Sequence, residues 1–141
     1  MDNPGSPEAF TVAKKSKRDW WQKGRSFDLW SIPHALFGIL VAFLPALIGI
    51  SFLTALTFTL VFAMAWEIYE KFVGIKETIQ NSLLDVLLPV VTFTLTSQIL
   101  FYYPPHPDDL MVFAAAIFIL FLFTNISGWR AYRRRNRNFT R

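Results

Sequence analysis

Two glutamates end a long apolar run in the segment Leu60-Val-Phe-Ala-Met-Ala-Trp-Glu-Ile-Tyr-Glu-Lys71. An aspartate, Asp85, lies just inside the next apolar run, which reads Leu83-Leu-Asp-Val-Leu-Leu-Pro-Val-Val91. An apolar run of about 20 residues has the length that crosses a bilayer as a helix. Carboxylates at such a depth are costly, and they usually face the interior of a helix bundle or a water-filled cavity. Glu67, Glu70 and Asp85 are therefore the first candidates for a functional site.

The composition is typical of a membrane protein. Of the 141 residues, 53% are hydrophobic and 17% are charged, whereas soluble domains carry about 25% charged residues. The chain has no Cys, which excludes disulfides and thiolate metal ligands. A long polar and basic stretch precedes the first apolar run, so we expect no cleaved signal peptide.

Hydropathy predicts an all-α fold, a four-helix transmembrane bundle over residues 31–131. We place its helices at about 31–48, 51–72, 82–102 and 109–131. Pro45 and Gly49 favour a turn between the first two. One long kinked region with a re-entrant segment is the alternative there. Residues 1–30 would form a basic, aromatic interfacial arm, and residues 132–141 an Arg-rich cytoplasmic tail.

The basic residues indicate the orientation of the chain in the membrane. Cytoplasmic connections collect Lys and Arg. All fourteen of these residues lie before the first span, around the second connection, or at and beyond the end of the fourth span. They are Lys14, Lys15, Lys17, Arg18, Lys23, Arg25, Lys71, Lys76, Arg130, Arg133, Arg134, Arg135, Arg137 and Arg141. Four spans with both termini in the cytoplasm fit this distribution.

The sequence pI of about 9.6 would also suit a protein that binds nucleic acid. We interpret the basic ends as anchors on an anionic lipid leaflet, and we expect no nucleic-acid partner. The five tryptophans would then lie near the inner interface as an aromatic belt. They are Trp20, Trp21, Trp30, Trp66 and Trp129.

This topology places His34 in one layer with the three carboxylates, near the inner leaflet. Glu67 and Glu70 share one helix face because they are three residues apart. On the third helix a polar stripe recurs about once per turn, through Asn81, Asp85, Pro89, Thr92 and Thr96. On the first helix a face of mostly small residues follows His34, through Gly38, Ala42, Pro45 and Gly49. Such faces normally pack against other helices, so the side chains should converge.

Each residue of this layer also has a purely structural interpretation. Ser82 and Asp85 have the spacing of a helix capping box. Glu70 could pair with Lys71 or a basic tail, and His34 could be a packing residue. Glu67 is hardest to explain in this way. A hydrogen bond to a neighbouring helix would be its structural role.

The chemistry of an imidazole with carboxylates is that of a divalent-cation site. The set suits Mg²⁺, Mn²⁺ or Ca²⁺ and tolerates Zn²⁺ or Fe²⁺. We therefore take His34, Glu67, Glu70 and Asp85 as candidate metal ligands or catalytic residues, with Asn81 and Thr92 in support. A metal-assisted or acid–base step on a phosphorylated lipid, or a proton relay, would use the same groups.

The segments Asp28-Leu-Trp-Ser-Ile-Pro-His-Ala-Leu-Phe-Gly38, Glu67-Ile-Tyr-Glu70 and Asn81-Ser-Leu-Leu-Asp85 carry a family resemblance. They resemble the VanZ-like group of small bacterial membrane proteins and the related YjdF-type inner-membrane proteins. The resemblance covers about residues 28–93 and implies a multi-pass protein of the bacterial inner membrane. It points to His34, Glu67, Glu70, Asn81 and Asp85, but the chain departs from the pattern at Val86-Leu-Leu-Pro89.

The leading functional hypothesis is an envelope protein that binds or processes a lipid-linked or amphiphilic substrate, with a divalent metal. A structural or accessory subunit of a larger membrane complex is the first alternative, and a proton- or ion-coupled carrier is the second. Membrane lipids are the expected partners, with other membrane subunits or further copies of the chain. Neither the substrate nor whether the protein is an enzyme follows from the sequence.

Overall fold

The computed structural model describes residues 29–75 and 78–139, with side chains in the last helix as far as Arg134. These residues form five helices and no strand. They are α1 (Ser31–Ala42), α2 (Leu44–Ile48), α3 (Phe52–Phe72), α4 (Ile79–Tyr102) and α5 (Pro107–Phe139). Four segments are long and apolar enough to cross a membrane, namely Ser31–Ile48, Phe52–Phe72, Ile79–Tyr102 and Pro107–Arg134. The predicted all-α fold with four spanning helices is confirmed, and it supports a multi-pass membrane protein.

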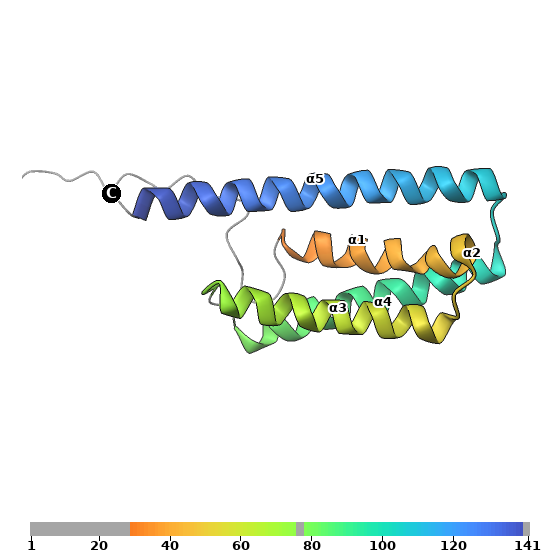
Figure 1. Ribbon diagram of the computed structural model, residues 1–141, viewed down its shortest axis with the longest axis horizontal. Helices are drawn as coiled ribbons and strands as arrows, with labels where there is room; N and C mark the ends of the chain where they lie inside the picture. The colour runs from red at the N-terminus through yellow and green to blue at the C-terminus, as the bar shows by residue number, and fades with distance from the viewer. Residues whose placement is uncertain (1–28, 76–77, 140–141) are drawn as a thin grey trace, which may run out of the picture.

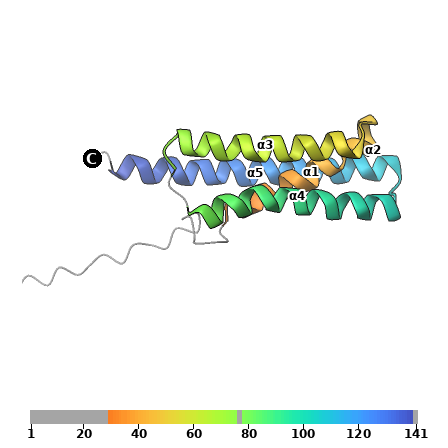
Figure 2. The ribbon, with the colours of Figure 1, turned by 90° about the horizontal axis from the view of Figure 1, so that it is seen from below.

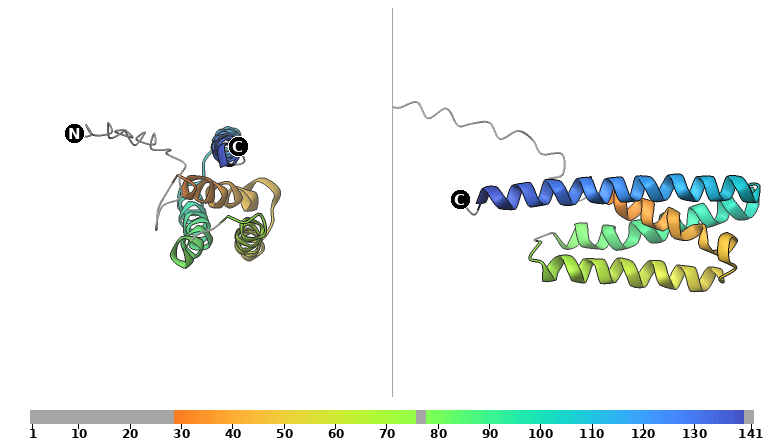
Figure 3. Two further views of the ribbon diagram at one scale, coloured as in Figure 1. Left: turned by 90° about the vertical axis from the view of Figure 1, so that its left-hand side faces the viewer. Right: turned by 45° about the horizontal axis from the view of Figure 1, so that its top comes forward.

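α1 is the central helix of the bundle. Viewed end-on, α5 covers one side of α1, while α3 and α4 lie on the other side (Figure 3). α5 runs alongside α1 and extends well beyond it (Figure 1). Seen from below, α1 and α5 overlap, with α3 on one side of them and α4 on the other (Figure 2). One end of the bundle therefore holds the starts of α1 and α4 and the end of α3. We call it the carboxylate end, because Glu67, Glu70 and Asp85 lie there.

The first two spans are separate helices. Pro45 has no N–H to continue the hydrogen-bond ladder, and the chain leaves α1 at Phe43 to form the short α2. Gly49 then ends α2 in the left-handed conformation, with φ of 73°. Ser51 caps α3, and its hydroxyl accepts a hydrogen bond from Thr54 N at 3.0 Å. The predicted turn is therefore present, and the alternative of one kinked region is wrong.

α4 begins at Ile79, three residues before the predicted start. Its N-cap is Thr78, whose hydroxyl accepts a hydrogen bond from Asn81 N at 3.2 Å. The interpretation of Ser82 and Asp85 as a capping box is wrong, because both lie inside the helix. Asp85 is in the second turn and is fully buried, so its position needs another explanation.

α1 and α4 pack most closely at Gly38. A methyl group on Gly38 would collide with the carbonyl of Pro89 and with Thr92 Oγ1. Thr92 Oγ1 also donates a hydrogen bond across the interface to Ala35 O at 2.9 Å. At Gly38 the small-residue face of the first helix therefore meets the polar stripe of the third, as the sequence predicts. The predicted face does not extend to Pro45 and Gly49, because Pro45 lies in α2 and Gly49 ends that helix.

α5 is longer than the predicted 109–131. It begins at Pro107, with Asp108 and Asp109 in its first turn, where acidic side chains favour the helix dipole. It continues to Phe139, so the predicted tail at 132–141 is helical over most of its length. At 1.5 Å per residue the helix is about 50 Å long, and the bilayer core is about 30 Å thick. Its basic end therefore projects past any membrane that the bundle spans.

Several predictions concern residues outside the described part of the chain. These are the interfacial arm over residues 1–28, its six basic residues, Trp20, Trp21 and Lys76.

Candidate functional site

Three side chains from three different helices meet at the carboxylate end. His34 lies in the first turn of α1, Glu67 in the last two turns of α3, and Asp85 in the second turn of α4. Each offers one ligand atom, and these atoms all lie within 4.8 Å of one another. We call these three residues the triad. The triad contains three of the four predicted site residues.

The triad is buried in the protein. His34 is 7% exposed, Glu67 6% and Asp85 0%. Acidic side chains are almost never this deeply buried unless they are paired or bind a metal. Two carboxylates and an imidazole at this spacing could hold a divalent cation or share protons.

Asn81 orients Asp85 within α4. Its side-chain Nδ2 donates a hydrogen bond to Asp85 Oδ2 at 2.9 Å, and both residues are fully buried. The two are four residues apart and so lie on one face of the helix. Asn81 therefore holds one carboxylate oxygen of Asp85 and has the supporting position that the sequence predicted.

Glu70 makes a contact with a tryptophan of its own helix. Its Oε1 accepts a hydrogen bond from Trp66 Nε1 at 3.0 Å, and the side chain is 2% exposed. It is not among the residues whose ligand atoms converge. The structure therefore places Glu70 beside the triad, and pairs it with the indole of its own helix.

Thr92 lies further along α4, away from the triad. Its hydroxyl bonds to Ala35 O, so it links α4 to α1. Thr92 supports the site through helix packing, at a distance of nearly two helical turns from Asp85. The second histidine, His106, is at the opposite end of the bundle. There its Nδ1 lies 3.7 Å from Asp108 Oδ2 and both side chains are exposed.

An aromatic cluster joins three helices at the carboxylate end. The Trp129 ring of α5 packs 6.2 Å from Trp30, 6.4 Å from Trp66 and 6.3 Å from Tyr69, measured between ring centroids. Tyr132 packs 5.5 Å from the same ring. The sequence predicted these tryptophans to be an interfacial belt. Trp30 is 2% exposed, and Trp30, Trp66 and Trp129 pack together at the carboxylate end, while their place relative to lipid stays a prediction.

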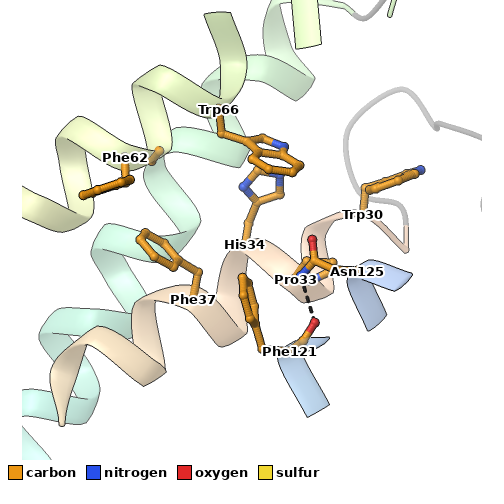
Figure 4. A pocket seen from close by; sticks show the side chains of 9 residues that line it. Trp30, Pro33, His34, Phe37, Phe62, Trp66, Phe121 and Asn125 are labelled. Carbon is orange, nitrogen blue, oxygen red and sulfur yellow. Dashed lines mark hydrogen bonds between the residues drawn. The ribbon is translucent and has the colours of Figure 1, made fainter. Parts of the chain in front are cut away.

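An apolar groove of about 210 Å³ lies beside the triad, between α1, α3 and α5. Its walls are mostly aromatic, and its polar lining groups are His34 and Asn125. Figure 4 shows the side chains of Trp66 and His34 pointing toward each other at one end, with Phe37, Phe62 and Phe121 beyond them. The Asn125 amide is fixed by its own helix, because Nδ2 donates to Phe121 O at 2.8 Å.

His34 is the residue shared by the triad and the groove. The groove was not predicted from the sequence. Its aromatic residues read as ordinary membrane-facing side chains, and only the packing of α5 against α1 brings Phe121 and Asn125 to His34.

Comparison of the chain with protein-family models, with curated proteins and with solved structures finds no match.

Proposed function

We propose that this membrane protein binds one divalent cation with His34, Glu67 and Asp85, and uses it to bind or process an amphiphilic, lipid-linked substrate. One observation carries the proposal, which is the convergence of three buried ligand atoms within 4.8 Å. Two ligands of one ion cannot be further apart than twice the metal–ligand distance. That limit is about 4.6 to 5.2 Å for Ca²⁺ and about 4.2 Å for Mg²⁺. The bound of 4.8 Å lies within the pair limit for Ca²⁺ and above that for Mg²⁺, and three ligands around one ion would move closer together on binding.

Three protein ligands leave coordination positions open. Mg²⁺ and related ions keep several such positions, and they are commonly bound by one or two carboxylates together with the phosphates of a substrate. A cation in the triad would be able to bind a phosphate and stabilise the charge that develops on its oxygens. The apolar groove beside His34 adds a place for the hydrocarbon part of the same molecule.

We further propose that the carboxylate end faces the cytoplasm of a bacterium. Lys71, Arg130, Arg133 and Arg134 lie exposed at or beyond that end. The connection at the opposite end, over residues 102–109, has no Lys or Arg and contains Asp108 and Asp109. This asymmetry is what the positive-inside rule describes. The resemblance to VanZ-like inner-membrane proteins implies a bacterial inner membrane, and its residue set includes the three residues of the triad.

Metal analysis of the purified protein tests the proposal. The wild type, loaded with Mn²⁺ or Ca²⁺ in detergent and then desalted, should retain about one ion per chain. Glu67→Gln and Asp85→Asn should each lose it, because each removes one charged ligand and keeps the shape. Glu70→Gln is the matched control and should retain the ion. A wild type without bound ion, or equal retention by all four proteins, would mean that the triad is a structural network.

A further inference from the structure

We infer that the groove between α1, α3 and α5 holds one unbranched acyl chain of a phosphate-bearing membrane lipid, with its head toward His34 and Asn125. This inference rests on the proposed function, because it names the class of amphiphile that the triad would serve.

The order of residues along the three helices gives the groove a direction. His34 is closer to the carboxylate end than Phe37 on α1, Trp66 is closer to it than Phe62 on α3, and Asn125 is closer to it than Phe121 on α5. The polar groups are thus all at the membrane surface side of the groove, and the phenylalanines lie deeper in the spans. A lipid inserted beside the protein has the same polarity, with its head at the surface and its chain inside.

The groove is open toward the outside of the bundle. Ala63 is 3% exposed and forms part of the floor, whereas Phe62 is 58% exposed and forms part of the rim. α3 and α5 both pack on α1, with the groove between them. Nearer the carboxylate end, Trp66 and Tyr69 contact Trp129 and so connect α3 to α5 beyond the groove. A chain can therefore enter sideways from the membrane.

The size and shape of the groove favour a slender occupant. Its volume of about 210 Å³ is below the range of about 300 to 1,000 Å³ that is usual for sites that enclose a whole small molecule. Flat rings on Phe37, Phe62 and Phe121 line it. Phe37 packs against both of the other rings, with its centroid 6.4 Å from that of Phe62 and 6.2 Å from that of Phe121, so the occupant would lie along the rings. An unbranched acyl chain is narrower than an isoprenoid chain, which carries a methyl branch on every unit.

The chemistry at the head end favours a phosphate. The His34 imidazole lies between the groove and the carboxylates of Glu67 and Asp85, and these three would hold the cation. A phosphate is the usual substrate ligand of a hard cation held by carboxylates. The acyl chain in the groove would bring that phosphate to His34 and its neighbours.

Photolabelling in lipid nanodiscs tests this inference. The probe is phosphatidic acid with a diazirine in the middle of one acyl chain, added to the full-length protein in phosphatidylcholine nanodiscs. Adducts located by mass spectrometry should concentrate on Phe37, Phe62 and Phe121, and unlabelled phosphatidic acid should suppress them. Phe123, which is 68% exposed on α5, reports labelling by bulk lipid and should not be suppressed.

Ala63→Phe should fill the floor of the groove, and it should reduce the groove adducts by about tenfold relative to Phe123. Ala65→Phe is the matched control, because Ala65 is exposed on the same helix, and it should change nothing. If Ala63→Phe does not fold, suppression of the groove adducts by unlabelled phosphatidic acid in the wild type tests the same point. Uniform labelling that no competitor suppresses, or stronger suppression by a polyprenyl phosphate, would overturn the inference. Metal content measured on the same samples separates this outcome from failure of the cation site.

Discussion

Gly38 of α1 lies directly against the backbone carbonyl of Pro89 in α4, with no room for a side chain between them. His34 is one turn before Gly38, and Asp85 is one turn before Pro89. The close approach of the two helices therefore determines how near the imidazole of His34 comes to the carboxylate of Asp85. Small residues at helix crossings in membranes allow such approaches, since close packing contributes to helix association there.

Gly38→Ala should destabilise the protein although Ala is the better helix former. In an open helix this change gains up to about 1 kcal/mol. Here the methyl group would collide with Pro89 O and Thr92 Oγ1, and overpacking of this kind costs about 1 to 3 kcal/mol. Thermal unfolding in detergent, followed by circular dichroism, measures the change. Ala65→Val, an enlargement on an exposed face of α3, is the control and should have little effect. A Gly38→Ala protein as stable as the wild type would show that the helices are further apart.

Thr92→Val should weaken the contact of α4 with α1. The substitution keeps the shape of the side chain and removes the hydroxyl. Its one proton is shared between Ala35 O across the interface, at 2.9 Å, and Leu88 O and Pro89 O within α4, at 3.0 and 3.2 Å. Interhelical hydrogen bonds in membranes contribute about 0.6 kcal/mol on average and up to about 1.7 kcal/mol. The free energy of unfolding in detergent should fall within that range.

Thr94→Val is the matched control for Thr92→Val. Thr94 Oγ1 donates to Val90 O at 2.8 Å within α4, so its loss leaves the helix interface unchanged. Equal losses for the two variants would mean that the bond to Ala35 O contributes nothing specific.

Asn81→Ala should lower the affinity for the cation without removing a ligand. Asn81 Nδ2 holds Asp85 Oδ2, and groups that orient metal ligands typically contribute about 10- to 100-fold in affinity. Titration of Mn²⁺ into the purified variant measures the change. Gln80→Ala, on an exposed position of the same turn, should bind as the wild type does. Unchanged affinity in Asn81→Ala would argue against Asp85 as a ligand.

Cation binding should become weaker as the pH falls. His34, Glu67 and Asp85 must each be deprotonated to coordinate an ion, so protons compete with it and binding releases them. Calorimetric titrations in buffers of different ionisation enthalpy count the released protons. Glu70→Gln should release the same number as the wild type, because Glu70 lies outside the triad. Binding that releases no protons would contradict coordination by these groups.

The spans and most of the candidate site are readable from the sequence, because both depend on strong local patterns. The four apolar runs and the break at Pro45 and Gly49 predict the helices, and helical spacing predicts the faces of Asn81 and Asp85. The separation of Glu70 from the triad could not be predicted, since helical spacing places it on the same face as Glu67, and only the structure shows its bond with Trp66. The start of α4 was misplaced because Thr78 caps the helix, and Ser82 offered the more obvious motif. The groove depends on how α5 packs on α1, and the residue pattern of a single helix does not predict how it packs on another.

Electron paramagnetic resonance of bound Mn²⁺ identifies the ligands of the cation directly. We expect one tightly bound Mn²⁺ per chain, with magnetic coupling to an imidazole nitrogen that disappears in His34→Gln. Glu67→Gln should abolish tight binding, and Glu70→Gln should leave both the binding and the coupling in place. A Mn²⁺ signal without nitrogen coupling, or binding that is insensitive to His34 and Glu67, would contradict a cation site at the triad.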